Sequence, residues 1–368
     1  MRIYRKELDS INSYKPGKPV EEVRRELGLD KVHKLASNEC PFYPAYIRKA
    51  VNREVRNINQ YPESGCFYLR DSLSRHLKVR KEQIVFGNGS DEIITLSLRA
   101  FIEAGDQVLV AYPTFLIYEI QARISGAGVV RVSLEDFGYS LRNMKKKICK
   151  NTKIIFIANP DNPSGTYVNH KELESFLLSI PAGILVYLDE AYFEFAPPDF
   201  PRSLDLLKKR GNLIVSRTFS KAYGLAGCRL GYAITTPAIA RVLNKVREPF
   251  NVNRFAQAAA LEALKNRKFL KKVIKHTEKE KEYFYSEFKK LNLPFVKSAT
   301  NFVLVKWSAD TAGIYNYLLK RGVIIRELRG WGFKNCFRVT VGKSSHNRAF
   351  IKLLRQYLSN RQTGRAKG

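Results

Sequence analysis

The chain has 368 residues, 45% hydrophobic and 27% charged, so it is long enough for a large core and more than one domain and too apolar to be disordered. No apolar run approaches the roughly 20 residues that span a bilayer, and no secretory signal is visible, so we expect a cytoplasmic protein with no membrane partner. The net charge of +30 is spread over the whole chain, and the five cysteines and five histidines form no ligand-spaced pair, so we expect neither a nucleic-acid partner nor a metal.

Residues from about 80 to 235 alternate between short apolar segments and helical patterns. Some of the segments, such as KIIFIA and ILVYLD, are apolar on both faces, which is typical of central strands in a largely parallel sheet covered by helices. This order predicts an α/β domain. The expected strands cover residues 83–86, 107–111, 129–133, 153–158, 184–188, 213–216 and 229–234, and helices are expected at 91–103 and 170–178, among others.

The pattern changes after residue 235. A region of long helices rich in lysine, glutamate and alanine follows to residue 291, and the helix that starts after about residue 237 is expected to join two domains. The rest of the chain indicates a smaller α+β domain, with strands at 301–307, 323–326 and 336–341 and helices at 309–321 and 346–358. We predict an N-terminal segment 1–40 that packs on the small domain, a large domain 41–247 and a small domain 248–368.

The first candidate site is the run GNGSDE, which contains Ser90 and Asp91 and links a strand to an amphipathic helix. Glycines before a helix N-terminus leave backbone N–H groups free to bind an anion, and the helix dipole favours the negative charge. An ordinary turn with Ser90 as helix cap explains the run equally well.

Two further candidates follow strands, at the edge of the sheet where α/β folds bind ligands. Phe115, in AYPTFLIY, could stack on a planar ligand, and Asn162, in ANPDNPSG, could donate a hydrogen bond into the same crevice. A core aromatic residue and a plain loop are the alternatives.

A carboxylate also follows a strand, in VYLDEAYFEF. Asp189 is expected to be partly buried, which requires a cationic partner such as a protonated pyridine nitrogen. Tyr192 could point into the same cavity. The alternative makes Asp189 a helix cap and Tyr192 a core residue.

The most informative run is SRTFSKAYGLAGCRLGY. It places Lys221 between the hydroxyls of Thr218 and Ser220 and a glycine-rich turn that ends at Arg229. A lysine amine can form a Schiff base with an aldehyde cofactor, and hydroxyls with an arginine can hold that cofactor's phosphate.

Two arginines, Arg326 and Arg338, lie near the ends of late strands. Convergent guanidinium groups recognise a carboxylate or phosphate. A pair of surface arginines is the alternative.

Taken in order, these motifs resemble the fold-type I, class II pyridoxal-phosphate aminotransferases over nearly the whole chain. The similarity is greatest to the histidinol-phosphate aminotransferase family, through SYKPGKPVEEVRRELGLDKVHKLASNECP, GNGSDE, SRTFSKAYGLAGCRLGY, GVIIREL and CFRVTVG. The resemblance implies an α/β fold with a large cofactor-binding domain around a mostly parallel sheet and a smaller α+β domain.

The resemblance also implies roles for the residues around the cofactor ring. Lys221 would hold pyridoxal 5'-phosphate as a Schiff base and Asp189 would pair with its pyridine nitrogen. Asn162 and Tyr192 would hydrogen-bond the phenolic oxygen, and Phe115 would stack on the ring. The residues implied for the phosphate are Ser90 and Asp91, through their backbone, with Thr218, Ser220 and Arg229.

Other implied roles concern the substrate and a second subunit. Arg338 would bind the carboxylate of glutamate or the phosphate of histidinol phosphate, assisted by Arg326. Tyr61 would reach the partner subunit's cofactor phosphate, so the resemblance implies a homodimer with shared active sites. Tyr14 and Asn38 would also lie near the substrate, and Cys40 stands where the family commonly has an asparagine.

The implied reaction converts L-histidinol phosphate and 2-oxoglutarate to imidazole acetol phosphate and L-glutamate in histidine biosynthesis, in a ping-pong cycle. Cofactor motifs do not fix the substrate, so an aromatic-amino-acid aminotransferase or a threonine-phosphate decarboxylase remains open. A basic nucleic-acid-binding protein that only retains the fold is the alternative from another class.

Overall fold

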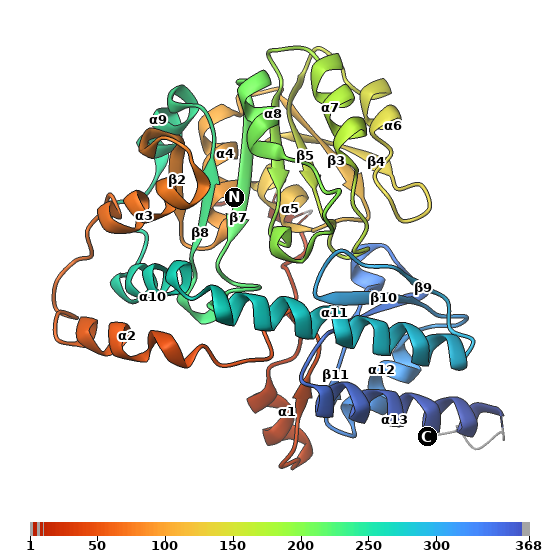
Figure 1. Ribbon diagram of the computed structural model, residues 1–368. Helices are drawn as coiled ribbons and strands as arrows, with labels where there is room; N and C mark the ends of the chain where they lie inside the picture. Colours follow the sequence, from red (N-terminus) through yellow and green to blue (C-terminus); the bar gives the residue numbers. More distant parts are fainter. Residues whose placement is uncertain (1–2, 6–7, 10, 363–368) are drawn as a thin grey trace.

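The structure, a computed structural model, describes residues 3–5, 8–9 and 11–362. The outer limits predicted at residues 1 and 368 therefore lie outside the described residues. Within these residues the chain forms a seven-stranded sheet, a four-stranded sheet and a short two-stranded one, with helices packed on the two larger sheets (Figure 1).

The large sheet has the strand order β2-β8-β7-β6-β5-β3-β4, in which only β8 runs against its neighbours. The predicted, largely parallel α/β sheet is therefore confirmed. Its strands are β2 (Ile84–Gly87), β3 (Gln107–Tyr112), β4 (Gly128–Ser133), β5 (Thr152–Ala158), β6 (Leu185–Asp189), β7 (Leu213–Thr218) and β8 (Gly231–Ile234).

The predicted start of the last strand of the large sheet is wrong. Residues 229–234 were expected to be extended, but Arg229 adopts a left-handed backbone with φ 55°, so β8 begins only at Gly231. Here the strand passes directly against the start of α4 (Ser90–Phe101), since a Cβ on Gly231 would lie 2.4 Å from the backbone nitrogen of Ser90. The turn at Arg229 therefore brings its side chain to the N-terminus of that helix.

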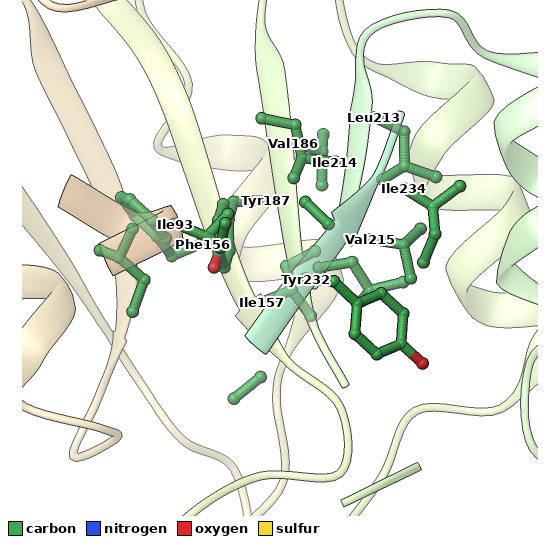
Figure 2. Close-up of a cluster of buried hydrophobic side chains, with 14 of the residues drawn as sticks. Ile93, Phe156, Ile157, Val186, Tyr187, Leu213, Ile214, Val215, Tyr232 and Ile234 are labelled. Atoms are coloured by element: carbon green, nitrogen blue, oxygen red, sulfur yellow. The ribbon is translucent and has the colours of Figure 1, made fainter. Parts of the chain in front are cut away.

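The main core lies on both faces of this sheet. Figure 2 shows part of it, where Phe156 and Tyr187 on adjacent strands lie beside Ile93 of α4. Several strands are buried along their whole length, which explains why their sequences are apolar on both faces. The helices of this part are α2 (Arg48–Val55), α3 (Phe67–Leu77), α4, α5 (Ile117–Ile124), α6 (Leu141–Lys146), α7 (His170–Ser179), α8 (Ser203–Lys209), α9 (Pro237–Val246) and α10 (Arg254–Lys265), with 3-10 turns η2 (Ala45–Ile47), η3 (Lys81–Gln83), η4 (Phe193–Phe195) and η5 (Ala226–Cys228).

The helix that bridges the two sheets is α11 (Arg267–Lys290), and not one that starts after about residue 237 as predicted. Thr236, Asn253 and Asn266 each accept a backbone N–H with the side chain, so each begins a separate helix. The third of these helices contacts η4 below the large sheet and β10 (Phe302–Lys306) in the small one, and Figure 1 shows it running between them.

The smaller sheet is antiparallel, in the order β12-β13-β10-β9. The strand predicted at 323–326 is split, because its first half pairs in parallel with the N-terminal segment and its second half joins the small sheet. The remaining elements are α1 (Val20–Leu27), β1 (His33–Lys34), β9 (Phe295–Val296), α12 (Ala312–Leu319), β11 (Val323–Ile324), β12 (Arg326–Glu327), η6 (Arg329–Trp331), β13 (Cys336–Thr340) and α13 (Ser344–Gln362).

Two features are absent from the described part of the chain. None of its helices combines the length and apolarity needed to cross a bilayer. Its histidine, cysteine and acidic side chains nowhere gather into a group of three or more that could hold a metal ion.

Candidate active site

A pocket of about 240 Å³ lies where the carboxyl ends of the large sheet's strands face the small sheet and the N-terminal segment. Every site residue predicted from the sequence except Tyr61 lines it. These residues are Tyr14, Asn38, Ser90, Asp91, Phe115, Asn162, Asp189, Tyr192, Thr218, Ser220, Lys221, Arg229, Arg326 and Arg338.

Strand register brings the chemistry of the large domain together. Asp189 is the last residue of β6 and pairs in register with Ser216 on β7, two residues before Thr218. Asn162 follows β5 and Phe115 follows β3, at the same edge. Because the carboxyl ends of parallel strands meet at one edge, four separate segments deliver their polar ends to one cavity.

The carboxylate of Asp189 is buried and faces the pocket. The Tyr118 hydroxyl donates to its Oδ2 at 2.6 Å, and the Ala191 N–H donates to its Oδ1 at 3.0 Å. Burial raises the pKa of Asp189 to about 6, which these two hydrogen bonds partly oppose. No described lysine or arginine forms an ion pair with it, so the site is suited to a cationic group on a bound ligand.

Lys221 projects into the same pocket. Its Nζ donates to the Ser37 carbonyl at 3.4 Å and lies 5.8 Å from the centre of the Tyr192 ring. Burial, followed by the positive charges of Arg338 and Arg229, lowers the pKa of the Lys221 amine to about 8. Roughly a tenth of this amine is therefore neutral and nucleophilic at pH 7, far more than for an ordinary lysine.

An anion cradle forms at the N-terminus of α4. Gly89 has φ 83°, a conformation that favours glycine, and the loop lies directly against the Arg229 guanidinium, since a Cβ there would lie 2.5 Å from its Nη2. Arg229 Nη2 also lies 3.5 Å from Asp91 Oδ2. The Ser220 N–H donates to the Thr218 hydroxyl at 3.0 Å, which fixes the turn below the cradle. A helix N-terminus, an arginine and hydroxyls together suit a phosphate.

Opposite the cradle, the N-terminal segment and the small sheet complete the pocket. Asn38 donates to the Tyr192 hydroxyl at 2.8 Å and accepts from Thr340 at 2.9 Å. Arg338 donates to the side-chain oxygen of Asn162 and, at 2.8 Å, to the Ala36 carbonyl. Burial lowers the pKa of Arg338 to about 10, which leaves it charged at neutral pH. The pocket therefore has two anion-binding ends.

Tyr61 does not contribute to the pocket of its own chain. Its side chain is 79% exposed and stacks on the Phe250 ring, with 4.6 Å between centroids. Other large apolar side chains nearby in the sequence are also exposed, among them Val55, Ile58, Phe67 and Tyr68.

Two residues near the site were missed by the sequence analysis. Tyr118 lies in the run AYPTFLIY, three residues after Phe115, and this one-turn spacing could have indicated that both face the same cavity. Trp331 gave no local signal, since it lies in a short 3-10 turn between two strands of the small sheet.

A buried ion pair fixes the strand ends behind the site. Glu190 follows Asp189 and Arg217 precedes Thr218; the Arg217 Nε donates to Glu190 Oε2 at 2.8 Å, and both side chains are 5% exposed or less. The Ser203 hydroxyl donates to the other carboxylate oxygen. The pair therefore ties together the two strands that carry Asp189 and Thr218.

We expect Glu190→Gln to lower the free energy of unfolding by about 3 kcal/mol, because it removes the nearest counter-charge of a buried guanidinium. Chemical denaturation measures this. Glu248→Gln is the matched control, since Glu248 pairs with Arg99 at 2.7 Å on the surface and its loss should cost less than about 1 kcal/mol. Equal effects of the two substitutions would contradict the prediction.

Comparison with known proteins identifies the class that this fold and site define. Residues 30–354 match the family described as aminotransferase class I and II. The chain is also 41% identical to the histidinol-phosphate aminotransferase of Moorella thermoacetica (96% of this chain, 93% of the relative) and 40% identical to that of Caldicellulosiruptor saccharolyticus (97% and 100%). The chain therefore belongs to the class I and II aminotransferases and, within them, to the histidinol-phosphate aminotransferase family.

Solved structures show the same fold. The histidinol-phosphate aminotransferase from Sinorhizobium meliloti, in complex with pyridoxal-5'-phosphate, superposes with a TM-score of 0.90 at 27% identity over 98% of both chains. The L-threonine-O-3-phosphate decarboxylase from Porphyromonas gingivalis superposes with a TM-score of 0.79 at 23% identity, over 89% of this chain and 100% of that chain. The second likeness shows the shared fold alone.

Proposed function

We propose that the protein is a pyridoxal-phosphate-dependent aminotransferase that converts L-histidinol phosphate and 2-oxoglutarate to imidazole acetol phosphate and L-glutamate in histidine biosynthesis. One observation carries this proposal. A single pocket holds a lysine with a lowered pKa, a buried carboxylate without a described counter-charge and two separate anion-binding ends. Family membership adds that relatives about 40% identical over nearly the whole chain carry the name of this enzyme. We also propose a cytoplasmic location, which a biosynthetic role supports.

The residues present fit the cofactor. Asp189 supplies an anion where the pyridine nitrogen would need one, and the cradle at Arg229 supplies donors where the phosphate would need them. Lys221 would hold the cofactor, Phe115 would stack on it, and Asn162 with Tyr192 would hydrogen-bond its phenolic oxygen. Pyridoxal phosphate, when bound, supplies the electron sink that stabilises negative charge at the substrate carbon bearing the amine.

The protein's own groups then move and hold protons. The Lys221 amine, neutral in part because burial lowers its pKa, would remove the proton from the carbon that bears the amino group of the first substrate. In the second half-reaction its protonated form would give a proton to the corresponding carbon of the keto substrate. Hydrogen bonds from the Tyr118 hydroxyl and the Ala191 N–H favour the charged form of the Asp189 carboxylate. This carboxylate would stabilise the positive charge of the cofactor's pyridine nitrogen. Asn38 orients the Tyr192 hydroxyl.

The two substrates would share the second anion-binding end. Arg338 would bind the carboxylate of glutamate or the phosphate of histidinol phosphate, and Arg326, Tyr14 and Asn38 would line the same end. Glutamate carries two carboxylates and histidinol phosphate carries a dianionic phosphate. One pair of arginines can therefore bind an anionic group of either substrate and serve both half-reactions.

The visible absorption spectrum of the purified protein tests this proposal. We expect a cofactor band that shifts when L-histidinol phosphate is added and returns with 2-oxoglutarate. Parallel titrations with L-phenylalanine and L-tyrosine rank the aromatic alternative. A band that persists with L-histidinol phosphate would overturn the substrate, and no band even after adding pyridoxal phosphate would overturn the enzyme.

We further propose a homodimer in which Tyr61 completes the partner's site. The support is that Tyr61 lies outside the pocket of its own chain and is exposed, as are two aromatic side chains that follow it in the sequence, Phe67 and Tyr68. Burying such side chains against a second copy would be favourable. In the family resemblance, this tyrosine hydrogen-bonds the cofactor phosphate of the other subunit.

A hybrid dimer tests the shared site. Tyr61→Ala should weaken cofactor binding about 10- to 100-fold, through loss of a hydrogen bond to a charged group. A hybrid dimer of one Tyr61→Ala chain and one Lys221→Ala chain should regain one intact site, which combines Lys221 of the first chain with Tyr61 of the second. At limiting cofactor, the activity of this hybrid should therefore exceed that of the Tyr61→Ala protein alone. If Tyr61 acts within its own chain, mixing will restore nothing.

A further inference from the structure

Trp331 lies between the two arginines of the substrate end. It closes the 3-10 turn η6, after Arg326 on β12 and before Arg338 on β13. Its ring centroid lies 5.4 Å from the Cζ of Arg326 and 5.7 Å from the Cζ of Arg338, and the side chain is 2% exposed. One buried indole therefore contacts both guanidinium groups.

Arg326 and Arg338 are direct cross-strand partners on β12 and β13. Each also faces a ring of its own, Tyr14 at 5.5 Å from the Cζ of Arg326 and Phe302 at 4.9 Å from the Cζ of Arg338, so Trp331 is the ring that they share. Arg326 donates to the Lys15 carbonyl at 2.6 Å, and Arg338 to the Ala36 carbonyl and the Asn162 side chain. Neither forms an ion pair with a described carboxylate, and the Nε of each is buried without a hydrogen-bond partner. Two like charges are thus held close together, and aromatic faces, which carry partial negative charge, offset part of their repulsion.

The position of the indole is set from both domains. Trp331 packs in an apolar cluster with Leu328 of the small domain and Phe115 of the large domain, whose ring centroid lies 6.2 Å away. The next residue, Gly332, has φ 102°, and a Cβ there would lie 2.7 Å from the Tyr112 hydroxyl of the large domain. Trp331 therefore cannot shift without opening the contact between the domains.

We infer that Trp331 is a positioning residue that holds Arg326 and Arg338 together and so makes the pocket select substrates with a dianionic end over those with a single negative charge. This inference rests on the proposed function for the identity of the substrates, although anion binding itself does not. The pairing of β12 with β13 keeps the two backbones together without the indole, but the guanidinium ends of the two side chains are expected to diverge, so a dianion loses its second contact while a monoanion loses little.

Anion binding to the cofactor-loaded enzyme is the first test, because the cofactor's own phosphate then fills the cradle at Arg229. The probes are inorganic phosphate, titrated by calorimetry at a pH where it is chiefly a dianion, and acetate as a monoanion. We expect Trp331→Leu to weaken phosphate about 5- to 30-fold and acetate less than about 3-fold. Trp331→Phe, which keeps an aromatic face, should restore most of the affinity for phosphate.

The chain offers a matched control, since its only other tryptophan, Trp307, is also buried but packs on Phe337 and Tyr357 in the small-domain core. Trp307→Leu should lower the melting temperature and leave anion affinity unchanged. In a Trp307→Phe protein, Trp331 is the remaining tryptophan, and its fluorescence should respond to phosphate. This measurement tests the contact between Trp331 and the anion-binding end even if Trp331→Leu does not fold.

Three results would overturn the inference: wild-type dianion affinity in Trp331→Leu, equal weakening by leucine and phenylalanine, or fluorescence of Trp331 that ignores phosphate.

Activity gives a separate comparison. The kcat/KM of Trp331→Leu should fall more for L-histidinol phosphate than for L-phenylalanine, and the fall should come from a higher KM and not from a lower kcat. Failure of the proposed reaction would leave the anion titrations interpretable, so the two proposals can fail independently.

Discussion

Replacing Lys221 with alanine is expected to lower kcat/KM by at least about 10⁴-fold and to abolish the cofactor's lysine-bound absorption band. The substitution removes both the amine that attaches the cofactor and the group that moves the proton, and proton transfer alone contributes up to about 10⁴-fold. The measurements are steady-state kinetics and the visible spectrum of the protein with added pyridoxal phosphate.

Lys281 provides a control for the loss of a buried lysine. It is 8% exposed, donates to the Ser298 carbonyl at 2.6 Å and has a pKa lowered by burial, but it lies outside the pocket. Lys281→Ala should reduce stability and keep the absorption band. A Lys221→Ala protein that retains both the band and the activity would contradict the assignment of the lysine.

The pKa of Lys221 adds a pH dependence to this prediction. Only the neutral amine attacks an aldehyde, and the pKa of this amine is about 8 in the cofactor-free protein. The rate of cofactor attachment should therefore rise as the pH increases toward about 8 and level off above it. A rate that continues to rise toward pH 10.5, the ordinary pKa of lysine, would show that burial does not act on this group as we infer.

Replacing Asp189 with asparagine is expected to lower kcat/KM by about 200- to 5,000-fold. Removing one partner of a buried ion pair costs about 3–5 kcal/mol, and each 1.36 kcal/mol is a factor of ten in rate. Asparagine keeps the size of the side chain and can still accept from the Tyr118 hydroxyl, so the change removes chiefly the charge. Kinetics with L-histidinol phosphate, at saturating cofactor, measure the effect.

Asp161 separates loss of this charge from loss of any buried carboxylate. Its pKa is also raised by burial to about 6, but its partners are structural, because it accepts from Thr114 at 2.6 Å and from the Ser164 N–H at 3.0 Å. Asp161→Asn should lower the melting temperature with a much smaller change in kcat/KM. If both substitutions reduce activity equally, Asp189 has no special relation to the cofactor.

The prediction of the fold succeeded where the signal was local and strong. Strands such as β5 and β6 are apolar on both faces because helices cover both sides of the sheet, and this pattern is visible without any partner. It failed where a boundary depended on a distant contact. Arg229 leaves the extended conformation because its strand meets the loop at Ser90, about 140 residues earlier. The strand predicted at 323–326 is interrupted because its first half pairs with β1 and its second half pairs with β13.

The prediction of the site shows the same division. The sequence indicated that Lys221, Asp189 and Asn162 follow strands and carry suitable chemistry, and all three line the pocket. It gave no sign that the Tyr118 hydroxyl supports Asp189, across 71 positions of the chain. Such a contact depends on the helix after β3 packing beside the end of β6. The spacing of Phe115 and Tyr118 indicates at most a shared face and does not specify Asp189 as the partner.

By itself, then, the sequence determined which chemical groups this protein has and where each stands relative to a strand or helix end, since burial patterns and turn residues are properties of neighbours in the chain. The tertiary structure alone decided which groups meet. Asn38 reaches Thr340 across 302 positions, and Trp331 contacts two arginines only because β12 and β13 pair beside the large domain. Register and packing fix these meetings, because each is a compromise among many contacts that no single segment contains.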